Sequence, residues 1–182
     1  MNKLYLGLVH NPVLNKFGEI VTTSITNLDM HDISRTALTF GVKKFFIINR
    51  LQSQRELFQR VKTFWESDVA RKYNENRTEA MRIISFAENI DEVTEEIKKL
   101  EGDCPLIITT SAKQCPGQTE YERIGDLTQP LLLLLGTGNG LAGEVLNSAD
   151  YCLTPIPGVN DYNHLSVRSA AAIILDRLTS NK

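Results

Sequence analysis

A chain of 182 residues fits one medium-sized domain and is long enough to bury a hydrophobic core. Apolar residues make up 42% of the chain and charged residues 23%, with a formal net charge of -2, which argues against a disordered or globally basic protein. The sequence has no run that approaches the roughly 18 consecutive apolar residues of a membrane span.

Six short apolar runs recur along the chain. The first lies in MNKLYLGLVHNPV, which has no small-residue cleavage site after it and is typical of a first strand, not of a signal peptide; we therefore expect a cytoplasmic protein. Short, nearly continuous apolar runs are typical of parallel strands covered on both faces. The predicted strands are 4–9, 44–49, 82–87, 105–110, 130–136 and 151–156.

Helical patterns lie between these runs. The first begins behind Asp29 or Asp32, either of which can cap a helix N-terminus, and ends at Gly41. In the second, Trp65 shares an apolar face with other large side chains and is assigned to the core. The predicted helices are 29–41, 53–67, 91–102 and 164–178, and the apolar face of the second comprises Leu57, Val61, Phe64 and Trp65.

The alternation of strands and helices predicts a single α/β domain over residues 1–182, with a parallel, Rossmann-like sheet. The polar segments 67–77 and 111–126 are predicted to be loops, which are often lids or binding segments. Residues 43–82 contain ten Lys and Arg against five Asp and Glu, which indicates either a polyanion footprint or a solvated helix face. Three cysteines without a Cys-x-x-Cys pair predict neither a disulfide framework nor a metal site.

The segment LLLLLGTGNGLAGEVL, 131–146, carries the strongest signal for a ligand. A dinucleotide site requires Gly-x-Gly-x-x-Gly after the first strand, whereas Gly136, Gly138 and Gly140 follow the fifth and the third glycine comes one residue early. No lysine followed by Ser or Thr comes after them, so the segment is not a P-loop. One glycine can mark a tight turn only, but three within five residues favour close approach of the backbone to a ligand.

Two further loops, 109–112 and 155–167, also follow strands. The second reads PIPGVNDYNHLSV, which combines rigid turns with polar groups in front of a helix. Ligands of open α/β sheets bind beyond the carboxyl ends of the strands, where these two loops and the glycine loop can converge.

Together these segments resemble the SPOUT superfamily of S-adenosylmethionine-dependent RNA methyltransferases, whose α/β fold ends in a trefoil knot. In DISRTALTFGVKKFFIIN, Arg35 matches the arginine of the family's first motif. LLLLLGTGNGLAGEVLNSADYCLTPIPG and HLSVRSAAAIIL look like the second and third motifs. The phrase YNHLSVRSAAAIILDRL looks like a SPOUT branch that is also found appended to tRNA guanine-N1 methyltransferases. The resemblance implies a knot and cofactor loops at about 105–170, S-adenosyl-L-methionine as cofactor, RNA (tRNA above all) as substrate, and a homodimer.

Three positions depart from the members that methylate the ribose 2′-oxygen. Asp29 stands where those members usually carry an asparagine, and the glycine loop GTGNG is shorter and lacks their glutamate. The segment 164–167 reads His-Leu-Ser-Val in place of Ser-Leu-Asn-Val. The outline of the cofactor cradle remains while the polar catalytic set differs, so methylation of a base and of a ribose both stay open.

The resemblance implies that backbone groups of the three loops hold the cofactor, with apolar contact from Leu141 and Leu165. Thr110 and Ser111 either border the cofactor or only cap a turn. The predicted cofactor-binding residues are Thr110, Ser111, Leu135, Gly136, Thr137, Gly138, Gly140, Leu141, Ile156, Gly158, Tyr162, Asn163, His164, Leu165, Ser166 and Val167.

Methyl transfer needs alignment and a group that polarises or deprotonates the nucleophile. Arg35 is the leading candidate, because arginine stays protonated and suits phosphate recognition. Asp32 is a base, an orienting group or a helix cap. His164 is a proton acceptor or fixes its loop by a hydrogen bond. Arg168 is expected to pair with an acid across a dimer, in preference to contacting RNA.

RNA contacts are expected from the positive stretch. Trp65 is assigned to the core, whereas Tyr73 and Tyr121 are candidates for stacking on bases. Two alternatives remain: a SPOUT module that binds RNA without turnover, and a Rossmann-type nucleotide-binding oxidoreductase, which the glycine spacing disfavours. The predicted substrate-binding residues are Arg35, Arg71, Lys72, Tyr73 and Arg77.

Overall fold

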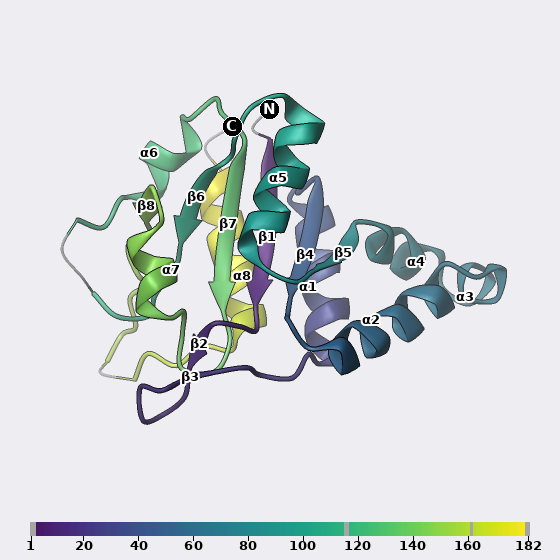
Figure 1. The fold of residues 1–182 in the computed structure, drawn as a ribbon. Coiled ribbons are helices and arrows are strands. Elements are labelled where there is room, and N and C mark those ends of the chain that lie inside the picture. The colour runs from purple at the N-terminus through teal and green to yellow at the C-terminus, as the bar shows by residue number, and fades with distance from the viewer. Residues whose placement is uncertain (1–2, 115–116, 161, 181–182) are drawn as a thin grey trace.

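A computed structural model describes residues 3–114, 117–160 and 162–180 of the chain. Six parallel strands form one sheet in the order β5-β4-β1-β7-β6-β8 (Figure 1). This arrangement confirms the predicted parallel α/β sheet. The strands are β1 (Leu4–Val9), β4 (Lys44–Ile48), β5 (Ile84–Ala87), β6 (Leu106–Thr109), β7 (Leu131–Gly136) and β8 (Tyr151–Cys152), and a separate antiparallel pair consists of β2 (Val13–Leu14) and β3 (Ile20–Val21).

Helices cover both faces of the sheet, which is why its central strands are apolar throughout. Along β1, Leu4, Leu6 and Leu8 contribute to the core on the face covered by α1 and α8. Tyr5 and Val9 contribute to the second core, under α5 and α7. The helices are α1 (Asn27–Thr39), α2 (Gln52–Trp65), α3 (Asp68–Tyr73), α4 (Glu75–Arg82), α5 (Ile90–Glu101), α6 (Tyr121–Gly125), α7 (Gly143–Asn147) and α8 (Val167–Thr179).

Every predicted strand except 4–9 is shorter in the structure, and for two of them the neighbouring residues give the reason. The run at 82–87 begins as a strand only at Ile84, because Arg82 is the last residue of α4. The run at 151–156 is a strand for two residues only, and the chain then enters a segment with two prolines, which cannot donate to a β-ladder.

The segment 67–77 is not the predicted loop but contains α3 and the start of α4. Each helix has its own side-chain cap: Ser67 Oγ accepts from the N–H of Ala70 at 3.2 Å, and Asn74 Oδ1 accepts from the N–H of Arg77 at 3.0 Å. Helices this short and polar have the composition of a loop, and only their capping residues distinguish them. Likewise, the predicted loop 111–126 contains α6.

The start of α1 and the buried face of α2 also differ from the prediction. Thr26, not Asp29 or Asp32, caps α1, and its Oγ1 accepts from the N–H of Asp29 at 3.1 Å. Trp65 is 6% exposed, as predicted for a core residue. Phe58 is buried with it, while Leu57 and Phe64, which the pattern assigned to the same face, are 42% and 50% exposed. Within the described ranges, none of the helices has the length and hydropathy that a transmembrane span requires.

Candidate functional site

Three loops lie beyond the carboxyl ends of the parallel strands, along the lower edge of the sheet in Figure 1. Thr110, directly after β6, donates its hydroxyl to the carbonyl of Leu134 in β7 at 3.1 Å. Asn163 donates its side-chain amide to the carbonyl of Ala112 at 3.2 Å. The segment after β6 therefore contacts both the end of β7 and the segment that leads into α8.

The glycine loop folds tightly against the β2–β3 hairpin. A Cβ at Gly136 would lie 2.7 Å from the backbone nitrogen of Leu141, and one at Gly138 would lie 2.8 Å from the carbonyl oxygen of Leu14. Leu14 also donates its N–H to the carbonyl of Gly140 at 2.9 Å. Gly140 has a φ of 109° and open space where its Cβ would be. The close approach at Gly138 is thus to the hairpin, and the open side of the loop is at Gly140.

A partly buried series of hydrogen bonds that sequence reasoning missed holds the first residues of this loop. His10 Nδ1 lies 3.0 Å from Thr23 Oγ1, and Thr23 Oγ1 lies 2.5 Å from Thr137 Oγ1. The Thr137 hydroxyl also bonds the carbonyl of Val9 at 3.0 Å. Burial lowers the pKa of His10 to about 4, against a small opposing effect of Asp29, so the ring is neutral near pH 7. The signal in the sequence was a histidine immediately after an entirely apolar strand.

Arg168, at the start of α8, joins α8 to α1. Its Nη1 lies 2.6 Å from Asp29 Oδ1, and its Nε lies 3.6 Å from Asp32 Oδ2. The second oxygen of Asp29 accepts from the Thr26 hydroxyl at 2.7 Å. The sequence analysis expected Arg168 to pair with an acid across a dimer, and in the described chain it pairs with two acids of its own chain. Arg35, on the next turn of α1, is exposed, and among the described residues it has no ion-pair partner.

The segment 154–166 carries most of its polar groups at the surface. Tyr162, His164 and Leu165 are exposed, and the rings of Tyr162 and His164 meet edge to face with their centroids 5.3 Å apart. Ser166 caps α8 by accepting from the N–H of Ser169 at 3.2 Å. A Cβ at Gly158 would lie 2.9 Å from the carbonyl oxygen of Tyr162, so this turn needs glycine.

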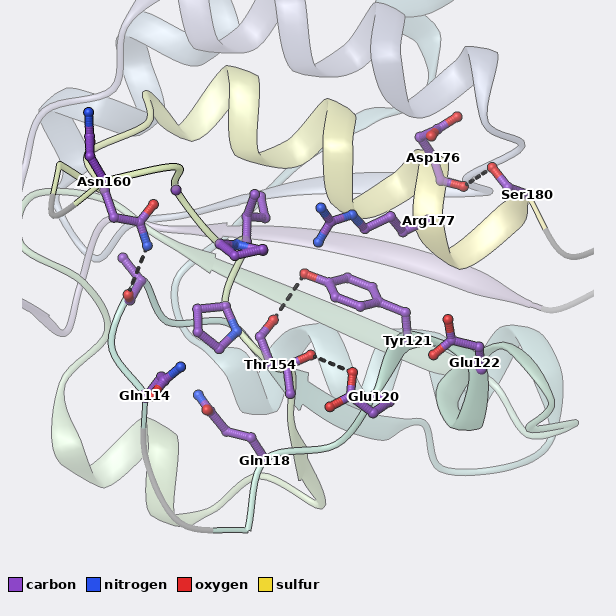
Figure 2. Close-up of a pocket in the computed structure, with 16 residues that line it drawn as sticks. Gln114, Gln118, Glu120, Tyr121, Glu122, Thr154, Asn160, Asp176, Arg177 and Ser180 are labelled. Carbon is purple, nitrogen blue, oxygen red and sulfur yellow. Dashed lines mark hydrogen bonds between the residues drawn. The ribbon is translucent and has the colours of Figure 1, made fainter.

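A cavity of about 960 Å³ opens on the other side of this segment (Figure 2). Ile156, Gly158 and Asn163 line it, whereas the glycine loop does not. The rest of its wall comes from the segment after β6, including Ala112 and Gln114, and from α6 and the end of α8. There the Arg177 guanidinium lies 5.2 Å from the ring centroid of Tyr121. The site predicted from sequence is therefore only partly brought together in one cavity.

Tyr121, a predicted stacking group, is buried beside this cavity. The residue is 6% exposed, and its hydroxyl donates to the carbonyl of Thr154 at 3.0 Å. Burial raises its pKa. Tyr121 therefore cannot offer its ring face to a base, which corrects the prediction.

The predicted RNA contacts at residues 71–77 lie far from the three loops. They belong to α3 and α4, which extend beyond the β5 edge of the sheet (Figure 1). Tyr73 is exposed, Arg71 pairs with Asp68 at 3.1 Å, and the Arg77 guanidinium lies 5.5 Å from the ring centroid of Trp65. Residues 71–77 and the three loops therefore lie on separate surfaces of the chain.

The chain matches known proteins over nearly its whole length. The model of a family described as SAM-dependent RNA methyltransferase matches residues 3–180. An uncharacterized protein from Aquifex aeolicus is 39% identical over 181 residues, which are 97% of this chain and 88% of that protein. A tRNA (guanine-N(1)-)-methyltransferase from Oleidesulfovibrio alaskensis is 40% identical over 177 residues. These residues are 96% of this chain but 41% of the relative, so the chain spans less than half of it.

A solved structure shows the same fold. The SpoU methyltransferase AviRb from Streptomyces viridochromogenes, in complex with the cofactor AdoMet, has a TM-score of 0.58 and 17% identity, covering 99% of this chain and 57% of that one. The predicted SPOUT architecture, an α/β fold with a trefoil knot, is thereby confirmed. The chain belongs to the family of S-adenosylmethionine-dependent RNA methyltransferases.

Proposed function

We propose that this protein transfers the methyl group of S-adenosylmethionine to a nucleotide of tRNA in the cytoplasm, with the cofactor between loops 109–112, 136–141 and 154–167. Family membership supports the cofactor and the RNA substrate. The tRNA is supported by the name of the relative from Oleidesulfovibrio alaskensis. The observation that carries the site is the contact of the loop after β6 with both neighbours, through Thr110 and Asn163.

The residues at this edge suit the parts of the cofactor. Ile156 and Leu165 offer partly or largely exposed apolar surface for an adenine ring, and the open side of Gly140 leaves its backbone approachable. Thr110, Ser111 and Asn163 offer the polar groups that ribose hydroxyls and the amino-acid tail require. When bound, S-adenosylmethionine supplies a methyl group already activated on a sulfonium, so the protein's main task is alignment.

The remaining roles fall to the side chains around α1 and the segment before α8. Arg35 is exposed and without an ion-pair partner in the described chain, so its guanidinium is available to a substrate phosphate or to the nucleophile. His164 is exposed on the loop before α8, where a neutral imidazole can accept the proton that the nucleophile loses. The role of Asp32 in this proposal is to orient the guanidinium groups beside it, because its Oδ2 lies 3.6 Å from Arg168 Nε and Arg35 is on the next turn of α1.

We also propose that residues 1–182 act as one domain and that two copies form a homodimer, as the resemblance to SPOUT enzymes implies. In α8, Ala171 is fully buried in the chain's own core, so the interface would use other positions such as the partly exposed Ala172 and Ile173. Sedimentation equilibrium tests this: a mass near the 20.5 kDa of one chain would contradict the dimer.

Calorimetric titration of the purified protein tests the cofactor, with NAD as control. We expect saturable binding of S-adenosylmethionine and no heat from NAD. Transfer of labelled methyl groups to deacylated bulk tRNA then tests the reaction. Arg35→Ala should lower the transfer rate at least 100-fold with cofactor affinity within about twofold. Arg82→Ala, an exposed arginine on α4, serves as the matched control and should keep the rate.

A module that binds cofactor and RNA without turnover is the second candidate. It is favoured by Asp29, which replaces the asparagine of 2′-O-methylating members and is engaged by Arg168 and Thr26. Cofactor binding without transfer to any RNA pool would select this candidate. Failure to bind S-adenosylmethionine would refute both.

A further inference from the structure

A second cavity, of about 530 Å³, lies between α1, α2 and α4, and residues of the three loops are not part of its lining. Its lining combines aromatic rings with arginines: Leu28, Asp32, Arg60, Phe64, Trp65 and Arg77 are among the residues that form it. We propose that this groove, which we call the α1–α2–α4 groove, binds one unpaired nucleotide of the substrate RNA. The proposal rests on the proposed function, which makes RNA the substrate.

The aromatic platform of the groove is the exposed ring of Phe64, and the buried Trp65, 6% exposed, packs against it. Phe64 and Trp65 meet edge to face, with ring centroids 5.3 Å apart. Trp65 Nε1 donates to His31 Nε2 at 3.1 Å, which fixes the indole orientation. Phe64 is 50% exposed and Leu28, on the facing helix α1, is 63% exposed. Bases stack on such aromatic surfaces without regard to sequence, because every base has a π-face.

The arginines of the groove are free to meet a phosphate. Of the ten cations in residues 43–82, five pair with carboxylates in the described chain, and Arg60 and Arg77 are not among those five. Arg77 packs over the Trp65 ring at 5.5 Å, which leaves its guanidinium edges available for hydrogen bonds. The one carboxylate in the lining, Asp32, lies 3.6 Å from the Arg168 Nε, so its charge is partly offset.

The position of the groove links it to the proposed reaction. Asp32 lines the groove and lies one helical turn before Arg35 on α1. A nucleotide seated on the platform would therefore be close along the RNA to the one that meets Arg35. An apolar groove alone would suit a protein segment equally. Arg60 and Arg77 have no carboxylate partner among the described residues and lie beside the exposed ring of Phe64, which favours a ligand that offers a phosphate and a base together.

The chain has a single tryptophan, so its fluorescence reports on this groove directly. The probe is single-stranded hexaadenylate, titrated into the full-length chain, with an abasic oligomer of the same ribose-phosphate length as comparison. We expect hexaadenylate to quench Trp65 and the abasic oligomer to bind at least fivefold more weakly. Phe64→Ala should weaken hexaadenylate binding roughly 5- to 150-fold, the range measured for stacked aromatics.

Matched variants separate the groove from the rest of the surface. Leu57→Ala changes an exposed apolar residue of the same helix outside the groove and should leave binding unchanged. Arg60→Ala should weaken binding and lower the salt dependence by about one phosphate contact, whereas Arg82→Ala should do neither. Phe64 and Leu57 are 50% and 42% exposed, so truncation of either side chain leaves the core intact.

Four results would overturn the inference, and the fourth leaves the proposed function standing. Equal affinity for the abasic oligomer would mean that the arginines bind backbone only. Equal losses of hexaadenylate affinity in Phe64→Ala and Leu57→Ala would mean that no base stacks on Phe64. Trp65 fluorescence that responds to protein concentration but not to RNA would make the groove an interface between copies of the chain.

The groove and the proposed function can fail separately. If tRNA is methylated while Phe64→Ala leaves KM and the RNA-induced quenching of Trp65 unchanged, the groove proposal is refuted and the proposed function stands. If hexaadenylate quenches Trp65 and Phe64→Ala weakens its binding as expected, but no methyl group is transferred, only the proposed function is refuted.

Discussion

The ion pair between Asp29 and Arg168 joins two segments 139 residues apart, and Asp29→Asn tests what it contributes to stability. The Asp29 side chain is 9% exposed and that of Arg168 is 34% exposed. Removing one partner of a fully buried pair costs about 3–5 kcal/mol, and exposed pairs contribute about 0–1 kcal/mol. For this half-buried pair, which retains the Thr26 hydrogen bond, we expect a loss of about 1–3 kcal/mol.

In a domain of this size about 1 kcal/mol shifts Tm by about 2–4 °C, so a loss of 2 kcal/mol corresponds to about 4–8 °C. Thermal melts followed by circular dichroism measure the shift, and urea denaturation gives the free energy. A double-mutant cycle with Arg168→Met should show a coupling of at least 0.5 kcal/mol.

Asp68→Asn is the matched control, because Asp68 pairs with Arg71 at 3.1 Å but is 84% exposed. We expect this control to change stability by less than about 0.5 kcal/mol. The reasoning is refuted if Asp29→Asn and Asp68→Asn have equal effects, or if Asp29→Asn and Arg168→Met are additive.

Three further predictions concern the glycine loop, its support and the short helices. The pKa of His10 is about 4 in the folded chain and near 6.5 in the unfolded chain, so the unfolded chain binds the proton first as pH falls. The free energy of unfolding should therefore drop by about 2 kcal/mol between pH 7 and pH 5. Urea denaturation of His10→Asn should lack this drop. Gly138→Ala meets both a φ of 59° and the carbonyl of Leu14, so calorimetry should show S-adenosylmethionine binding at least tenfold weaker, whereas Gly102→Ala, at a φ of 83° with open space, should keep it. Asn74→Ala removes the cap of α4 and should cost about 1 kcal/mol in urea denaturation; no loss would count against α4 as a capped helix.

The strands that the sequence predicted correctly are those whose local pattern fits only one kind of element, a buried strand. β1, β4 and β7 are short apolar runs between turn residues, and burial on both faces of a parallel sheet requires such runs. The end of α1 just before Gly41, where φ is 71°, was predictable for the same local reason, although the last helical residue is Thr39. Where polar composition fits a loop and a short exposed helix equally, as at 67–77, the prediction was wrong.

The sequence by itself therefore determined the α/β class, the glycine loop and the resemblance to SPOUT methyltransferases, because these depend on neighbouring residues and on motif order. Only the tertiary structure decided that β7 lies beside β1, that Arg168 pairs with Asp29, and that His10 supports Thr137 through Thr23. These contacts join residues up to 139 positions apart. Patterns along the chain carry no record of such pairs, since each depends on how the sheet orders its strands and how α1 and α8 pack on one face.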